Sequence, residues 1–184
     1  SAEIEVREVD AHNIVPCWVA SERKETKVTT FRLRLYELLP LFLVEYDDVL
    51  PHPIKAFPFP ATDWDSIAST LGVNLNDTPP CEAGVAVALA VLTSFIHNRL
   101  EKYPAGRRIA TRQGQSGLSP YLHFGQISAQ RVALAVNGAV AVESISPLAR
   151  DVFFEELILQ RELADNFCLY EPNYDSVKGF PSCA

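Results

Sequence analysis

The stretch of sequence that points most clearly to chemistry is a run of small and hydroxyl-bearing residues before a helix-start signal. It contains Gln115, Ser116, Gly117, Leu118 and Ser119, and it leads directly into a proline. Free backbone N–H groups and the positive end of a helix dipole favour an anion at such a corner, so the pattern is typical of phosphate binding. Serine is also the ordinary cap of any helix. The composition of the stretch leaves both interpretations open.

A second candidate is the cation Arg161, which interrupts an apolar helical stripe. It follows Leu157 by four residues and precedes Ala164 by three, so helical spacing turns it toward the apolar side. A buried guanidinium needs an anionic partner, because an unpaired buried charge is strongly unfavourable. That partner is either a carboxylate such as Asp165 one turn on, or a bound ligand, and the sequence leaves both possibilities open.

The histidines and cysteines indicate neither a catalytic pair nor a metal centre. His12 and His123 have no nucleophile at a recognisable spacing, and we expect each to be a hydrogen-bonded structural residue. The four cysteines, at positions 17, 81, 168 and 183, are scattered without a Cys-x-x-Cys pair. This pattern favours reduced thiols and an intracellular protein, and it predicts no structural metal. We assign no catalytic residue within the chain.

Charge and hydropathy restrict the class of protein. The formal net charge of −7 contrasts with the basic excess of most free-standing nucleic-acid binders. Contact with DNA would therefore depend on local patches such as Arg107, Arg108 and Arg112, or on residues outside this sequence. The longest apolar run, around residues 84–92, is too short for a membrane span, and we expect no membrane partner. There is no methionine, so we expect the true start to lie elsewhere or to have been processed away.

The first third of the chain gives mixed signals. Residues 3–9 alternate apolar and charged side chains, which predicts a half-buried strand. Residues 29–44 carry both strand-like and helix-like spacing, and we predict a helix that breaks at Pro40, because proline removes a backbone donor. Prolines at 51, 53, 58 and 60 then predict a linker over residues 49–62.

The remainder predicts helices. Apolar residues at 85, 89, 92, 96, 100 and 103 favour one amphipathic helix over residues 82–103, followed by a glycine-containing basic loop. Ser119 with Pro120 is expected to open a short helix, and Ser128 to cap another that reaches residue 136. Ser146 begins the last helix, with an apolar stripe at positions 153, 157, 164 and 168. The predicted fold class is mainly α.

Three of these segments, in this order, resemble the class II cyclobutane-pyrimidine-dimer DNA photolyases of the photolyase/cryptochrome family. Residues 6–16, VREVDAHNIVP, are similar to a strand and turn near the end of the family's antenna domain. Residues 116–131, SGLSPYLHFGQISAQR, resemble its flavin-phosphate signature, and residues 155–168 with 173–176 resemble its next long helix and loop. The resemblance covers nearly the whole chain and identifies it as an internal fragment.

The resemblance implies two domains and a reaction. Residues 1–48 would be the C-terminal part of a Rossmann-like α/β antenna domain, and residues 63–184 the N-terminal half of an all-helical FAD-binding domain. In this family, photoexcited reduced FAD passes an electron to a pyrimidine dimer flipped out of damaged DNA, the ring bonds break and the electron returns. The resemblance does not identify the antenna pigment.

Matching the motifs position by position implies roles for individual residues. Gln115, Ser116, Gly117, Leu118 and Ser119 would surround the flavin phosphates, and three further residues would lie near them. Tyr103 would contact the cofactor, Arg107 would reach toward DNA, and Glu156 with Arg161 would face the lesion and the flavin. The chain departs from the family at Gln160, where an arginine pair is usual, and at residues 108–111, where an asparagine-proline stretch is typical.

A second hypothesis assigns the chain no flavin chemistry. The later helices of the family, which hold the flavin ring and much of the DNA surface, are not in this sequence. A truncated photolyase-like chain could instead act as a structural or partner-binding subunit, with another protein covering its apolar helix faces. The acidic net charge and the departures above favour this alternative.

Overall fold

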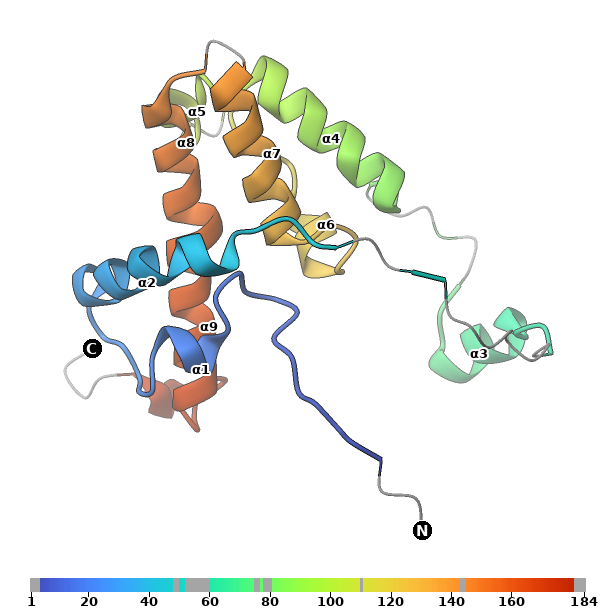
Figure 1. Ribbon diagram of the computed structural model, residues 1–184. Helices are drawn as coiled ribbons and strands as arrows, with labels where there is room; N and C mark the ends of the chain where they lie inside the picture. The colour runs from blue at the N-terminus through green and yellow to red at the C-terminus, as the bar shows by residue number, and fades with distance from the viewer. Residues whose placement is uncertain are drawn as a thin grey trace. The chain divides into compact units, whose positions relative to one another are not determined.

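A computed structural model describes residues 4–47, 50–51, 60–74, 77, 81–109, 111–142 and 145–180. The chain divides into two compact units. The first contains Ser1–Glu45 and Ala83–Ala184, and the second contains Tyr46–Glu82. Helices dominate the described residues, and none of those residues forms a strand (Figure 1). The mainly helical fold class is confirmed. No helix among the described residues is long and apolar enough to span a membrane.

The first unit contains most of the secondary structure. Its elements are α1 (Cys17–Ala20), α2 (Val28–Phe42), α4 (Val85–Asn98), α5 (Tyr103–Gly106), α6 (Ser119–His123), α7 (Ala129–Val142), α8 (Pro147–Phe154), the π-helix η1 (Glu155–Gln160), α9 (Arg161–Tyr170) and the 3₁₀ turn η2 (Val177–Gly179). The elements α8, η1 and α9 follow one another without a break and form one rod (Figure 1).

This rod organises the core of the first unit. Helices α5 and α7 contact α8, α2 and α7 contact η1, and α1 contacts α9. The apolar cluster between them includes Leu35 of α2, Phe95 of α4, Val136 of α7, and Phe153 and Ile158 of the rod. Removing this apolar surface from water is the main force that holds the helices together. Residues before Glu45 and after Ala83 therefore share one core.

Helix α2 confirms the helical interpretation of residues 29–44 but not the predicted break. The helix continues through Pro40 and ends at Phe42. Proline cannot donate a backbone hydrogen bond, but here it lies in the last turn, where only two helical residues follow it. The buried side chains of Phe31, Leu35 and Leu39 hold the helix against the core, and this packing outweighs one missing hydrogen bond.

The predicted helix starts are correct at two of three positions. The hydroxyl of Ser128 accepts from the N–H of Arg131, and that of Ser146 accepts from the N–H of Ala149. Ser119 is not a cap: it is the first residue of α6, and Leu118 occupies the cap position without a side-chain hydrogen bond. Leu118 is fully buried, so packing of its side chain fixes where α6 begins.

Helix α4 is shorter than the predicted helix over residues 82–103. It ends at Asn98, and a turn precedes the separate helix α5. The buried face carries Leu92, Ile96, Leu100 and Tyr103 as predicted, whereas Val85 and Leu89 are exposed. The C-terminal half of the predicted stripe therefore packs in the core.

The strand predicted over residues 3–9 is wrong for its described part, residues 4–9. This segment is irregular and points away from the helices (Figure 1), and Ile4, Val6 and Val9 are 81%, 88% and 77% exposed. A strand needs a neighbour for its backbone groups, and the described residues supply none. The assignments of residues 1–48, 49–62 and 63–184 to domains and linker stay predictions, and residues 52–59 of the linker lie outside the described residues.

The second unit contains α3 (Trp64–Leu71). The side chain of Asp63 caps its start by accepting from the N–H of Ser66 at 3.0 Å. Gly72 ends it in the left-handed conformation, with φ of +65°. Both signals are ordinary helix boundaries.

The apolar stripe predicted along the last helix is wrong beyond Leu157. Ala164 is exposed, and the buried positions of α9 are Glu162 and Asn166. The cause is η1, because a π-helix bonds residue i to i+5 and needs about one more residue per turn than an α-helix. Every residue after η1 is therefore rotated relative to the α-helical pattern.

Candidate functional site

A cavity of about 440 Å³ opens between α5, the following loop, the start of α6 and η1. Its walls are formed by Tyr103, Arg107, Arg108, Gln115, Ser116, Ser119 and Glu156, and we call it the serine-corner cavity. Six of the nine site residues predicted from the sequence lie in this one wall, although the rod residue Glu156 is far from the loop in sequence. Gly117 and Leu118 belong to the same turn but do not line the cavity. Arg161 does not line it either.

The ring of Tyr103 is fixed by two other aromatic rings. It makes edge contacts with Phe95 at 5.6 Å and with Phe153 at 5.3 Å between ring centroids, and it is only 7% exposed. Such contacts restrict the ring orientation. Burial raises the pKa of the Tyr103 phenol above its ordinary value, and the nearby Arg107 opposes that rise. The phenol is therefore a neutral group at the edge of the cavity.

Two glycines bring the loop after α5 back against that helix. A Cβ at Gly114 would lie 2.6 Å from the backbone carbonyl of Gly106, so a larger residue at position 114 would displace the backbone. The returning loop is held by Arg99, whose guanidinium donates to the carbonyl oxygen of Ser116 at 3.3 Å. The Gln115 amide donates to the carbonyl oxygen of Arg107 at 3.4 Å. These contacts place Gln115 and Ser116 in the cavity wall.

Gly117 and Leu118 shape the turn from behind. Gly117 has φ of +73°, a conformation that glycine adopts without the steric cost of a side chain. Leu118 is fully buried in the apolar cluster, and its N–H donates to the hydroxyl of Ser116 at 3.3 Å. The core thus fixes one end of the turn, while Ser116 and Ser119 line the cavity.

The charges in the cavity give it a positive excess. Arg107 forms an ion pair with Glu156 of η1, which joins the loop to the rod. Arg108 has no ion-pair partner among the described residues. The wall therefore offers two guanidinium groups, three hydroxyls (those of Tyr103, Ser116 and Ser119) and an amide against one carboxylate. Donors of this kind suit the oxygens of a phosphate group.

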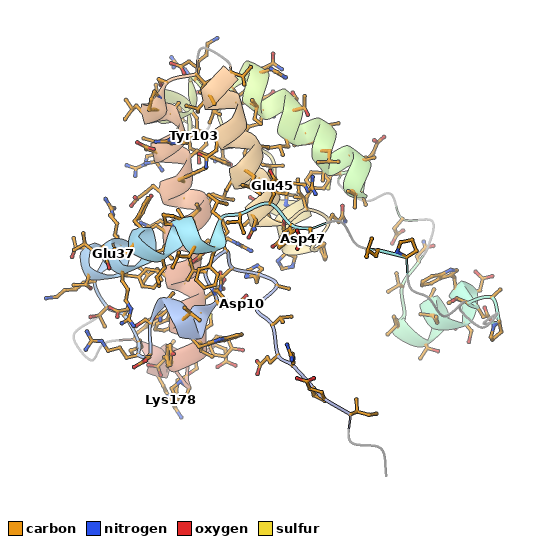
Figure 2. All side chains as sticks on the ribbon, viewed as in Figure 1. Asp10, Glu37, Glu45, Asp47, Tyr103 and Lys178 are labelled. Atoms are coloured by element: carbon orange, nitrogen blue, oxygen red, sulfur yellow. The ribbon has the colours of Figure 1, made fainter. Side chains whose placement is uncertain are left out.

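Arg161 lies in a different electrostatic environment, next to the N-terminal segment. Its guanidinium is affected by Asp165, Glu162 and Asp10, and desolvation lowers its pKa below the ordinary value. One of its terminal nitrogens, Nη1, is buried without a hydrogen-bond partner in the described part of the chain. Figure 2 shows Asp10 and Tyr103 at different levels along the rod. The charges of these carboxylates therefore act on Arg161, but no ion pair joins its guanidinium to one of them among the described residues, so the structure does not decide between the two possibilities raised by the sequence.

Glu162 is buried instead of Arg161, because the π-helix η1 rotates the residues that follow it. Its side chain is 2% exposed, and one oxygen accepts from the N–H of Ile14 at 2.8 Å. The other oxygen, Oε2, has no partner among the described residues. Desolvation raises the pKa of Glu162 to about 7, against hydrogen bonds from the backbone of Ile14 and Val15 and the charge of Arg161.

Asp10 organises the segment that Glu162 contacts. Its carboxylate accepts from the backbone N–H groups of His12, Asn13 and Cys17 and from the Asn13 amide, at 2.9 to 3.0 Å. Desolvation alone would raise the pKa of Asp10, but these hydrogen bonds together lower it. His12 is hydrogen-bonded to Asp165 at 2.7 Å, as expected for a structural histidine. Residues 10–17 therefore form a clasp on α9.

Sequence reasoning missed Glu162, Asn166 and Arg108. In a regular α-helix, the positions of Glu162 and Asn166 would belong to the polar face. Their residue types do not predict the π-helix that turns them into the core. Arg108 was recognisable only as part of the basic patch beside Arg107. Among the described residues, no group of three or more His, Cys, Asp or Glu side chains could hold a metal ion.

Comparison with known proteins finds extensive similarity to one named group. The chain is 42% identical over 190 residues to a protein of Arabidopsis thaliana, 40% over 178 to one of Potorous tridactylus and 40% over 186 to one of Oryza sativa subsp. japonica. These alignments cover 97%, 94% and 96% of the chain, and all three proteins are named deoxyribodipyrimidine photo-lyase. The chain is homologous to a segment of the photolyases. No family model matches it.

The chain spans only 38%, 32% and 36% of the lengths of those relatives. The similarity covers the serine-corner cavity and the clasp alike, since almost the whole chain is aligned. The photolyase resemblance of the sequence is confirmed, whereas its class II assignment is not settled by these names.

Proposed function

We propose that the chain is a portion of a class II photolyase, a light-driven, FAD-dependent enzyme that splits cyclobutane pyrimidine dimers in damaged DNA. The observation that carries the proposal is the serine-corner cavity, which gathers the hydroxyls of Ser116 and Ser119 with two guanidinium groups around one opening. The names of the relatives support the same reaction. In this proposal residues 1–48 end an antenna domain, and residues 63–184 begin the flavin domain.

The donors of the cavity fit the phosphate end of FAD. Ser116, Ser119, Gln115 and Arg108 would hold the phosphate oxygens, and the edge of Tyr103 that lines the cavity would lie beside the cofactor. At about 440 Å³ the cavity is the size of a small ligand site and would hold only part of the dinucleotide. When bound, the reduced flavin supplies the electron that opens the dimer. The task of these residues is to fix the cofactor and neutralise its charge.

The ion pair of Arg107 and Glu156 would serve the DNA side. A guanidinium that can exchange a carboxylate for a DNA phosphate keeps a charge-assisted partner in both states. Glu156 would then be available to accept hydrogen bonds from the edge of a flipped-out base. Arg161 lies outside the serine-corner cavity, so its predicted place on the flavin side of the pocket is tested separately from that of the serines.

Flavin retention tests the proposal directly. The purified 184-residue chain is mixed with FAD, passed over a desalting column and examined for visible flavin absorption. We expect Ser119→Ala and Arg161→Ala to lower the retained flavin, and Ser69→Ala, at an exposed position of α3, to leave it unchanged. Thermal unfolding of each variant separates loss of binding from loss of fold. Unchanged flavin in both site variants would refute the placement of the pocket.

Repair activity tests the reaction. A dimer-containing oligonucleotide is illuminated with blue light in the presence of the flavin-loaded chain, and restored thymines are measured. The alternative function, a structural or partner-binding subunit, is favoured by the exposed apolar side chains of Ile4, Val6 and Val9. A chain that stays colourless with FAD and co-purifies with a defined protein would support that alternative.

A further inference from the structure

Arg99 does not line the serine-corner cavity, but its side chain contacts two structures that carry the cavity wall. It is the half-buried residue directly after α4, and α4 ends close to α5 and α8 (Figure 1). A cation at the end of a helix also suits the helix dipole, and that contribution requires only a positive charge. The two side-chain contacts require more, because they use a planar group with several N–H donors.

The first contact of Arg99 is with the ring of Phe95, which belongs to an aromatic cluster. The guanidinium carbon lies over this ring, 5.8 Å from its centroid. Phe95 is fully buried, and its centroid lies 5.6 Å from that of Tyr103 and 4.9 Å from that of Phe153. The rings of Tyr103 and Phe153 are themselves 5.3 Å apart. Because each ring restricts the other two, the guanidinium covers the cluster that orients Tyr103 at the cavity.

The second contact of Arg99 holds the turn that carries the serines. Its Nη2 donates to the carbonyl oxygen of Ser116 at 3.3 Å, which directs this oxygen toward a residue outside the cavity wall. A carbonyl oxygen would repel the oxygens of a phosphate, whereas the Ser116 hydroxyl can donate to them. That hydroxyl also accepts from the N–H of Leu118 at 3.3 Å. Both oxygens of Ser116 therefore have a fixed direction.

The two contacts join parts of the wall that lie apart in the sequence. Tyr103 belongs to α5, whereas Ser116 follows the loop that returns past Gly114 and lies 17 residues after Arg99. Gln115 is held to α5 through the carbonyl of Arg107, so it does not connect the turn to α4. The guanidinium of Arg99 makes this connection, and it thereby couples the position of the turn to that of the aromatic cluster.

We propose that Arg99 is a positioning residue for the flavin site, one that fixes the Ser116 turn relative to the Tyr103 ring without touching the cofactor. The inference rests on the proposed function, because it assigns the space in front of these two wall elements to the phosphate end of FAD. A lysine would supply the same charge. Its single ammonium group cannot replace a planar group that lies over a ring and donates from a separate nitrogen, so the site requires arginine at position 99.

The test uses three variants of the 184-residue chain. Arg99→Met removes the charge and the N–H donors but keeps a long apolar side chain against Phe95. Arg99→Lys keeps the charge, and with it the attraction for phosphate and the contribution to the helix dipole. Arg150→Met is the matched control, because Arg150 is also half-buried, its loss changes the net charge equally, and it does not line the serine-corner cavity. FAD affinity is measured by equilibrium dialysis, and amide hydrogen exchange by NMR without flavin.

Both Arg99 variants should bind FAD about tenfold more weakly than the wild-type chain, the size expected for loss of one hydrogen bond from a charged donor. Arg150→Met should bind FAD like the wild-type chain. Without flavin, the N–H of Leu118, which donates within the turn, should exchange about tenfold faster in both Arg99 variants for the same reason. The N–H of the fully buried Val136 in α7 should change much less, since a general loss of stability would accelerate both amides alike.

Two results would overturn the inference. Wild-type FAD affinity in Arg99→Lys would mean that the residue acts through its charge alone. Wild-type exchange of Leu118 in both Arg99 variants would mean that the turn is fixed without this side chain. The exchange measurement needs no flavin, so it separates the two proposals. A wild-type chain that binds no FAD, with faster Leu118 exchange in the variants, would refute the flavin site and support the positioning of the turn by Arg99.

Discussion

The buried carboxyl of Glu162 should make the stability of the folded chain fall as the pH rises through the neutral range. The perturbation that reveals it is Glu162→Gln. Glutamine has nearly the same shape and keeps the oxygen that accepts from Ile14, but it cannot ionise. Its amide nitrogen replaces an oxygen that has no partner among the described residues. The substitution therefore removes the titration with little change in packing.

The sign and size of the effect follow from the pKa of Glu162 in the two states. Desolvation raises it from 4.5 to about 7 in the folded chain, so between these values the folded state holds a proton that the unfolded state has lost. Stability is then highest at low pH and declines as pH rises. At about 1.4 kcal/mol for each pH unit, the full decline is about 3 kcal/mol, most of it between about pH 5 and pH 8.

The assay is urea unfolding of both proteins across that pH range, followed by the difference in their free energies of unfolding. The wild-type chain should lose about 2.5 kcal/mol relative to the glutamine variant from about pH 5 to pH 8. Taking the difference cancels groups that titrate independently of position 162. Glu22→Gln, at an exposed position, is the matched control and should give a flat difference.

A flat or rising difference between wild type and Glu162→Gln would refute the reasoning. It would mean that the carboxylate is compensated in the folded chain, with Arg161 as the nearest cation able to do so. An NMR titration of the Glu162 carboxyl carbon checks the same point without unfolding. Its midpoint should lie near 7.

The remaining predictions concern the loop and the packing of α9. Gly114→Ala should lower flavin retention and stability together, because its Cβ would meet the backbone of α5 at 2.6 Å. Gly138→Ala is the control in α7, where an added Cβ would have no atom within 4 Å, and it should raise stability by up to about 1 kcal/mol. Equal thermal shifts of the two variants would contradict the close approach. Asn166→Ala should cost about 2–3 kcal/mol in urea unfolding, because the fully buried Asn166 side chain accepts from the half-buried N–H of Glu25 at 2.8 Å and donates to the carbonyl oxygen of Arg23 at 3.1 Å. The exposed Asn98→Ala should cost less than half as much, and a similar cost at both positions would argue against the buried contact.

Local sequence signals predicted the helical elements well where a side chain acts on its own backbone. Ser128 and Ser146 cap their helices as expected, since each hydroxyl bonds an N–H only three residues away. The motif shared with photolyases also anticipated that Tyr103, the serine corner and Glu156 belong together, and the fold brings them to one cavity. The sequence alone could not supply Arg108 as a further wall residue, because its place depends on how the loop returns.

Where neighbours far along the chain decide the outcome, the sequence was insufficient. Residues 4–9 have the alternation of a strand, but a strand requires a partner, and Ile4 and Val6 remain exposed without one. Pro40 should end a helix by local rules, and packing of α2 on the core carries the helix past it. In both cases the conformation depends on contacts, absent or present, with residues far away in the sequence, which local patterns do not reveal.

The amino-acid sequence by itself determined that the chain is mainly helical and where the helices capped by Ser128 and Ser146 begin. It also predicted phosphate binding at the turn of Gln115, Ser116 and Ser119, residues that the fold brings into one cavity wall. Only the tertiary structure decided which charge is buried in α9. Six residues of π-helix rotate the helix after Gln160, so Glu162 enters the core beneath Ile14 while Arg161 turns toward Asp10 and Asp165. A π-helix gives up the i to i+4 hydrogen-bond pattern, and it persists because the packing on both sides of it fixes the faces of α8 and α9.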